Sequence, residues 1–296
     1  MNTSKNSASV AHCNTQEVHF KYCLNTSTIR GQNLGLIGEL KTAAKAGYDS
    51  VEPWIESIRI YLAEGGSLKD LDKRIKDLGL TVESGIGFAQ WIVDDPVVRV
   101  QGLEEAKSDM NLLAQIGGKR IAAPPKGATE KPGLDLSAAA GRFHALLEVG
   151  REMGIIPMLE VWGFSKNLHR VSQAVFVAME SGHKDASLLL DIYHVYKGGS
   201  SFKGINMLSK TSMPVIHIND YPSDPPWEMI ADKDRIYPGD GIAPLGDIFR
   251  ELASINPEIV FSLELFNPDY WEQDALEAAK TGLIKMKEEV AKALGQ

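Results

Sequence analysis

The sequence predicts an α/β protein folded as a single (β/α)8 TIM barrel. Eight short apolar runs alternate with helical patterns along the 296 residues. The centres of these runs lie about 34 residues apart, which is the size of one βαβ unit. No GxGxxG sequence follows the first run, which weighs against a doubly wound open sheet, the other fold with this alternation. Composition does not shift at mid-chain, so we expect one domain over residues 19–296.

Each predicted strand is a short apolar run. The strands cover residues 20–24, 50–53, 81–84, 120–123, 156–161, 188–192, 215–219 and 260–265. Helices are predicted where apolar residues recur at three- and four-residue spacing. They cover residues 33–46, 68–78, 97–116, 137–153, 168–180 and 274–293, with shorter patterns at 202–209 and 245–253.

Capping residues support these boundaries. Asp95 and Pro96 supply an N-cap and a first-turn proline for the helix at 97–116, and Ser67 caps the helix at 68–78. A glycine follows five of the helical patterns and precedes a strand, where a helix commonly ends in a left-handed residue. These glycines are Gly47, Gly79, Gly117, Gly154 and Gly182.

Composition narrows the possible function classes. The chain has 39 acidic and 31 basic residues and a formal charge of −8, whereas nucleic-acid binding needs clustered Lys and Arg. No apolar run approaches the length of a membrane span. Cys13 and Cys23 form neither a disulfide framework nor a CxxC motif, so we expect reduced thiols in a cytoplasmic protein.

The first residues differ from the rest of the chain. Residues 1–18 are polar and lack the apolar stretch of a secretion signal. We interpret them as a disordered lead or an extension added during cloning. A signal peptide already removed from the precursor is left open.

One ionisable residue lies at the end of each of the last four predicted strands: Glu160, Asp191, His217 and Glu264. Strand ends of a barrel converge at its carboxyl face. A lone carboxylate buried there costs several kcal/mol unless it is paired or binds a cation. Three carboxylates and one imidazole suit a divalent ion such as Mn²⁺, Mg²⁺ or Co²⁺, and the lack of thiolates weighs against structural zinc. For any single position, a salt bridge or a hydrogen-bonded strand end is the alternative.

Other residues near strand ends are candidates for substrate contact. Trp54 and Trp162 could stack on a sugar, although core packing is the alternative for each. We expect Glu52 to bind substrate hydroxyls, with an ion pair inside the barrel mouth as the alternative, and the same two roles are open for Glu83. The short run at 197–200 could wrap a phosphate with backbone N–H groups, but it matches no complete P-loop.

Residues 20–292 resemble the xylose isomerase-like TIM barrel superfamily, and in particular its sugar phosphate isomerase/epimerase branch, which includes ketose 3-epimerases and hydroxypyruvate isomerases. The resemblance rests on the strand-end glutamates, the Asp-x-x-His pair of Asp191 and His194, His217 within HIND, and the loop 234–241 (DRIYPGDG). It implies that Glu160, Asp191, His217 and Glu264 bind one metal ion, with Mn²⁺ expected and Mg²⁺, Co²⁺ or Zn²⁺ as alternatives.

The resemblance also implies roles in catalysis. Glu160 and Glu264 would act as acid and base, His194 would contact substrate oxygens, and Arg235 would contact the reacting end of the sugar. These roles are chemically reasonable. A metal cation stabilises the negative charge of an enediolate, and carboxylates placed beside the substrate can remove a proton from carbon and return one. Two bases on opposite faces give epimerisation, whereas one base shuttling between adjacent carbons gives isomerisation.

The sequence therefore predicts a metal-dependent isomerase or epimerase of a small sugar or sugar derivative. A lyase or dehydratase acting on a keto-sugar or keto-inositol by β-elimination is one alternative, and a non-catalytic sugar-binding barrel is another. No carboxylate occurs in residues 162–167, where ketose 3-epimerases usually carry one, which weighs against a simple 3-epimerase. We expect no nucleic-acid or membrane partner, and a homo-oligomer, dimer or tetramer, by analogy with relatives.

Overall fold

The computed structural model describes residues 18–295 and contains eight parallel strands. All eight strands correspond to predicted runs, with ends shifted by at most two residues. They are β1 (Lys21–Asn25), β2 (Ser50–Glu52), β3 (Thr81–Val82), β4 (Arg120–Ala123), β5 (Ile156–Glu160), β6 (Ser187–Asp191), β7 (Val215–Ile218) and β8 (Val260–Leu263).

The strands form one closed circle, as a TIM barrel requires. Their order is β3-β2-β1-β8-β7-β6-β5-β4, and a bridge between Gly85 and Ile121 joins its two ends. Gly85 N donates to Arg120 O at 3.1 Å, and Ala122 N donates to Gly85 O at 2.9 Å. The predicted fold class is therefore confirmed, although β3 is short and the closing pairing lies just beyond it.

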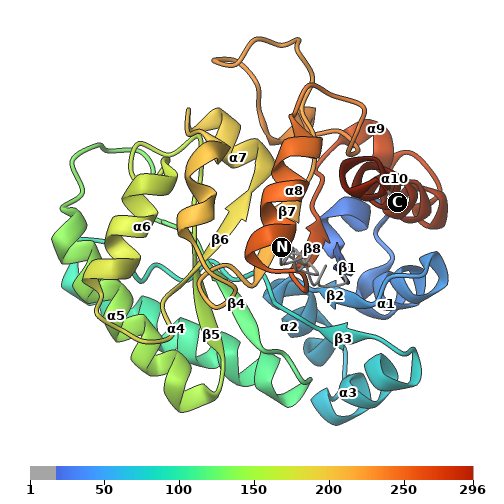
Figure 1. Cartoon of the computed structure of the whole chain (residues 1–296). Coiled ribbons are helices and arrows are strands. Elements are labelled where there is room, and N and C mark those ends of the chain that lie inside the picture. The colour runs from blue at the N-terminus through green and yellow to red at the C-terminus, as the bar shows by residue number, and fades with distance from the viewer. Residues whose placement is uncertain (1–17, 296) are drawn as a thin grey trace, which may run out of the picture.

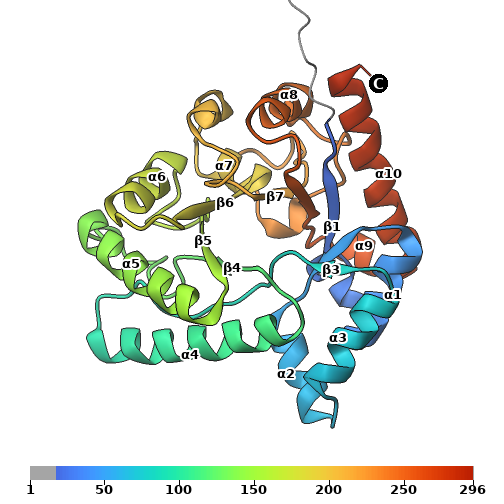
Figure 2. The same ribbon diagram turned by 60° about the horizontal axis from the view of Figure 1, so that its bottom comes forward.

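Helices cover the outside of the barrel (Figures 1 and 2). Seven of the predicted helices are present, with ends shifted by up to three residues: α1 (Gly35–Ala46), α3 (Leu68–Asp77), α4 (Pro96–Gln115), α5 (Leu136–Met153), α6 (Val171–Glu180), α8 (Leu245–Ile255) and α10 (Ala275–Leu294). The eighth, predicted at 202–209, is the short 3₁₀ helix η2 (Phe202–Met207). Gly204 and Asn206 within it are poor α-helix formers.

Five short helical segments were not predicted. They are η1 (Thr26–Gln32), α2 (Ile55–Ala63), α7 (Ile192–Lys197), η3 (Asp232–Asp234) and α9 (Pro268–Trp271). Each has at most nine residues, too few for a clear helical period, and all follow strands on the carboxyl side of the barrel. They therefore lie where the site residues are expected.

The predicted caps are present. The Asp95 side chain accepts hydrogen bonds from Val97 N and Val98 N, and Ser67 Oγ accepts one from Asp70 N. All five glycines predicted to end helices have positive φ. Local sequence signals thus set most helix ends.

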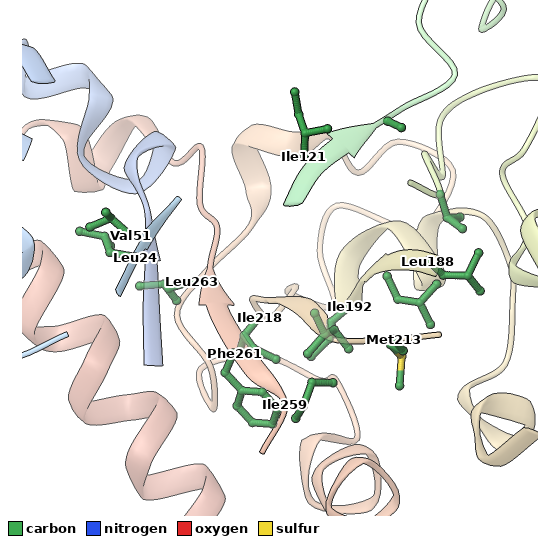
Figure 3. Packing of buried hydrophobic residues seen from close by; sticks show 14 of the residues in the cluster. Leu24, Val51, Ile121, Leu188, Ile192, Met213, Ile218, Ile259, Phe261 and Leu263 are labelled. Carbon is green, nitrogen blue, oxygen red and sulfur yellow. The ribbon is translucent and has the colours of Figure 1, made fainter. Parts of the chain in front are cut away.

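Strand alternation divides the buried residues into two layers. On β8, Phe261 and Leu263 belong to the large cluster between strands and helices, whereas Val260 belongs to the smaller cluster inside the barrel. Figure 3 shows part of the large cluster, with Ile218, Phe261 and Leu263 on neighbouring strands. The same alternation turns Ser262 and Glu264 inward, so β8 carries polar groups toward the barrel axis.

The N-terminal prediction is only partly within the described residues. Residues 1–17, including Cys13, lie outside them, while Val18 packs against the large cluster. Cys23 is a buried free thiol inside the barrel. None of the helices within residues 18–295 is long and apolar enough to cross a membrane.

Helix α1 carries a buried carboxyl group, Glu39, which is 6% exposed. Its Oε2 has no hydrogen-bond partner. Burial raises the pKa of Glu39 to about 7, although a hydrogen bond with Thr26 and the charge of Arg30 act in the opposite direction. An ionised Glu39 therefore destabilises the folded state.

We predict that Glu39→Gln raises the free energy of unfolding by roughly 3 kcal/mol above pH 7 and has little effect below pH 4.5, the ordinary pKa. The folded state holds this proton more tightly than the unfolded state. The free energy of unfolding of the wild type therefore falls as the pH rises from 4.5 to 7. Urea denaturation at both pH values measures the effect. The exposed Glu180→Gln is the control, and equal stabilisation by Glu39→Gln at both pH values would contradict the prediction.

Candidate metal and substrate site

Four strand ends bring the predicted metal ligands together. Glu160 and Asp191 are the last residues of β5 and β6, His217 lies in β7, and Glu264 directly follows β8. Asp191 pairs in register with His217, so these residues share one level of the barrel. All four are buried.

The imidazole of His217 lies among the three carboxylates. Its Nδ1 is 3.1 Å from Glu264 Oε2, 3.9 Å from Asp191 Oδ2 and 4.0 Å from Glu160 Oε1. Ligand atoms of Asp191, His217 and Glu264 all lie within 4.8 Å of one another. A single ion with bonds of about 2.0–2.6 Å could reach all three.

The other nitrogen of His217 is held by Glu52. Nε2 lies 2.9 Å from Glu52 Oε2, while Nδ1 is buried and has no hydrogen-bond partner. When only Nε2 carries a proton, the imidazole would present a lone pair at Nδ1 to a cation, which is the usual arrangement of a histidine metal ligand supported by a carboxylate. The donor set and this unpartnered atom therefore fit a divalent metal.

Of the two roles predicted for Glu52, the structure shows the ion pair, with His217 as the partner, and not contact with the cavity. Its side chain is fully buried and is absent from the cavity lining. Its Oε2 also accepts hydrogen bonds from Ser262 Oγ at 2.7 Å and Asn25 Nδ2 at 3.0 Å. The expected substrate contact is therefore replaced by support of His217.

The buried carboxylates of the cluster favour the binding of a positively charged group beside them. Burial raises the pKa of Glu160 to about 8, and the neighbouring Glu264 and Asp191 add to this while His217 opposes it. Burial disfavours charge on His217, but Glu264 and Glu52 raise its pKa well above the ordinary value. The same carboxylates would attract a metal cation.

Arg235 lies beside the cluster with a buried guanidinium. Nη1 donates to Glu264 Oε2 at 2.6 Å and Asp191 Oδ2 at 3.0 Å, and Nη2 donates to Asp232 Oδ1 at 2.5 Å. Nη2 also lies 3.0 Å from His194 Nε2. Burial and the charge of Arg235 lower the pKa of His194 to about 4, so its imidazole is neutral.

A cavity of about 180 Å³ opens beside these groups. Most of its wall is apolar, because aromatic side chains from several loops meet there. The lining residues are Trp54, Ile86, Phe88, Glu160, Trp162, Phe164, His194, Asp232, Arg235, Glu264 and Phe266. The structure thus places the predicted Trp54, Trp162, His194 and Arg235 around one cavity.

Sequence reasoning missed Asn25, a buried residue that links three parts of the site. Its Nδ2 donates to Glu264 Oε1 at 2.9 Å as well as to Glu52, and its Oδ1 accepts from Trp54 Nε1 at 3.2 Å. Asn25 directly follows the predicted strand at 20–24, so reading one residue further would have found it. Phe88, Phe164 and Asp232 were also missed, because loops at strand ends have no periodic pattern.

Two alternative predictions are resolved by hydrogen bonding. Glu83 is ion-paired with Lys21 at 2.6 Å, Lys119 at 2.9 Å and Arg120 at 3.1 Å, so it is not free to bind substrate. At 197–200, the N–H groups of residues 198–200 donate to backbone carbonyls of residues 194–196. The suggested phosphate-binding role of this run is therefore wrong.

Asp220 holds the loop that carries Arg235. Its carboxylate accepts four backbone hydrogen bonds, from Tyr221, Gly239, Gly241 and Ala243 at 2.8–3.0 Å. Asp220 and Ile236 also exchange two backbone hydrogen bonds. The side chain of Asp220, just after β7, thus binds backbone N–H groups that follow Arg235 in the loop.

The fold and the strand-end cluster define a TIM barrel with a candidate metal site at its carboxyl face. The chain matches the family model of the xylose isomerase-like TIM barrel over residues 40–288 and belongs to that family.

The similar curated proteins include inosose isomerases from several bacteria. The one from Bacillus licheniformis is 27% identical over 281 residues, which cover 92% of this chain and 98% of that protein. The one from Bacillus velezensis is 27% identical over 271 residues, covering 88% and 94%.

Solved structures share the fold. The IOLI protein with a bound zinc atom superposes with a TM-score of 0.85 and 24% identity, covering 92% of this chain and 99% of that one. L-ribulose 3-epimerase superposes with a TM-score of 0.75 and 18% identity, covering 93% and 96%.

We predict that Asp220→Asn lowers the free energy of unfolding by about 2–3 kcal/mol, because an amide group cannot accept all four hydrogen bonds and leaves buried donors unpaired. Urea denaturation measures the loss, and limited proteolysis should show faster cleavage within residues 235–243. The exposed Asp247→Asn serves as control. Wild-type stability together with wild-type proteolysis would contradict the role of Asp220.

Proposed function

We propose that the protein is a divalent-metal-dependent isomerase or epimerase of a small keto-sugar or keto-cyclitol. The observation that carries this proposal is the pair of carboxylates Glu160 and Glu264, which flank His217 Nδ1 and also line the aromatic cavity. Groups in this position can contact both a metal ion and a substrate. Two such carboxylates are what proton transfer at a carbon next to a carbonyl requires.

The comparisons support this class of reaction. The inosose isomerase from Bacillus licheniformis aligns over almost its whole length, and a neighbouring fold belongs to L-ribulose 3-epimerase. An inosose is a ring polyol bearing a ketone, whose C–H bonds beside the carbonyl are weakly acidic. We therefore place an inosose among the first substrates to test.

Glu160, Asp191, His217 and Glu264 would hold the metal ion, with Mn²⁺ as first choice. The IOLI protein, which has a similar fold, binds a zinc atom, so Zn²⁺ belongs in the same test. When bound, the cation would supply positive charge to the oxygens of the enediolate. It would also satisfy the unpartnered Nδ1 of His217.

The protein groups would perform the proton transfers. Glu160 and Glu264 would remove a proton from the substrate and return one, while His194 and Arg235 would hold its oxygens. The rings of Trp54, Phe88 and Phe266 would pack on C–H faces of the substrate and exclude water. Transfer between two faces of one carbon gives an epimer, whereas transfer between adjacent carbons gives an isomer.

We predict that wild-type enzyme with Mn²⁺ incorporates deuterium from D₂O next to the carbonyl of an inosose, a ketose or a 3-keto-sugar. Glu160→Gln and Glu264→Gln should each slow this exchange at least ~100-fold, because an amide cannot accept the proton. NMR spectroscopy measures the exchange, and the exposed Glu277→Gln is the control. Loss of water during exchange would indicate the elimination reaction instead, and unchanged exchange in both active-site variants would overturn the mechanism.

We predict that Glu52→Gln weakens Mn²⁺ binding by about 10–100-fold. The amide no longer fixes the proton on His217 Nε2, so Nδ1 is less well prepared as a ligand. Isothermal titration with Mn²⁺ measures the affinity directly, without substrate. Glu83→Gln is a matched control, since Glu83 is also a buried, ion-paired barrel glutamate. Wild-type affinity in Glu52→Gln would contradict the supporting role.

A further inference from the structure

Asp232 has a different position from the other carboxylates of the cavity. It begins η3, in the long connection from β7 to α8 that extends beyond the barrel in Figure 1. Its side chain lines the cavity and is 42% exposed, whereas that of Glu264 is 6% exposed. Among the described residues, the carboxylates that lie within 4.0 Å of His217 Nδ1 are those of Glu160, Asp191 and Glu264, and Asp232 is not one of them.

One oxygen of Asp232 remains available to a ligand. Oδ1 accepts a hydrogen bond from Arg235 Nη2, and within residues 18–295 no hydrogen bond engages Oδ2. Burial disfavours the charged form, but Arg235 and His194 lower the pKa of Asp232 below its ordinary value. An ionised carboxylate with a free oxygen is a strong acceptor for a hydroxyl group.

In the described lining of the cavity, no Lys or Arg side chain is free to bind a phosphate group. Arg235 is the single Lys or Arg side chain in its described lining. Its guanidinium already donates to Asp191, Glu264 and Asp232, and it packs over the rings of Tyr193 and Phe266.

Hydrogen-bond donors next to the cavity already have partners within the protein. Lys197 Nζ donates to the backbone carbonyls of Trp227 and Glu228, and the N–H groups of residues 198–200 end helix α7. Away from the metal ligands, a phosphate in the cavity would therefore meet aromatic rings and carboxylates, with no free Lys or Arg side chain in the described lining to pair with it. Desolvating its charge there would be costly.

Cavity size points in the same direction. Its volume of about 180 Å³ is below the ~300–1,000 Å³ usual for drug-sized ligands. A single polyol ring with a ketone is the size of substrate that fits.

We propose that Asp232 is a specificity-determining residue, which accepts a hydroxyl group of an uncharged, single-ring polyol and repels phosphorylated analogues. This inference rests on the proposed function, because it concerns the substrate of the same site. Asp232 acts by contact with the substrate and by holding Arg235 Nη2, and it takes no part in proton transfer. In Asp232→Asn the negative charge is lost, the amide oxygen can still accept from Arg235 Nη2, and an NH₂ donor replaces the free carboxylate oxygen.

Binding of myo-inositol and myo-inositol 1-phosphate tests this proposal, because neither has a ketone that the enzyme could convert. Isothermal titration, with and without Mn²⁺, should show the wild type preferring myo-inositol by at least ~10-fold. Asp232→Asn should weaken myo-inositol binding by about 10-fold and strengthen binding of the phosphate, so that the preference disappears. Quenching of tryptophan fluorescence gives a second readout, since Trp54 and Trp162 line the cavity.

Asp234→Asn is the matched control. Asp234 lies in the same 3₁₀ helix but accepts a hydrogen bond from Ala231 N, so its substitution removes an equal charge outside the cavity. A wild type without preference for myo-inositol, or an equal loss of preference in Asp234→Asn, would overturn the proposal. Preferential binding without deuterium exchange would instead refute only the proposed reaction, which separates the two failures.

Discussion

The hydrogen bond between Glu52 and His217 is the interaction on which the site depends. Both side chains are fully buried, and together they connect β2 to β7 across the barrel. The bond directs Nδ1 of His217 toward Glu160, Asp191 and Glu264. Without it, the carboxylates would face an imidazole of undefined orientation, and a buried charge on Glu52 would have lost its main partner.

Polar contacts around this pair explain how a cluster of carboxylates can be buried. Asn25 joins Glu52 to Glu264, and Arg235 bonds Asp191 and Glu264. Asp220 in turn fixes the loop that carries Arg235. Glu52, Asp191 and Glu264 therefore each have a nearby donor or cation, and the network links the ends of β1, β2, β6, β7 and β8. Aromatic side chains form part of the wall of the cavity beside these groups.

Much of the fold could be predicted because its signals are local. Apolar runs locate the strands, and residues such as Asp95 and Ser67 cap the helices as expected. The short segments α2, α7 and η3 were missed because they lack a helical period. In the site, Glu160 and Glu264 stood out as charges in apolar strands. Asn25 and Phe88 did not, because amide and aromatic residues are common at strand ends for other reasons.

The sequence by itself determined the barrel, the level at which the four strand-end residues meet, and the types of ligand atom they offer. These follow from strand periodicity, since the carboxyl ends of parallel strands lie on one face. Only the tertiary structure decided that Glu52 supports His217 instead of facing the cavity, that Glu83 is neutralised by three cations, and that Asp232 stands beside Arg235. Such partners depend on the direction of each side chain and on contacts between segments far apart in the chain, which no local pattern encodes.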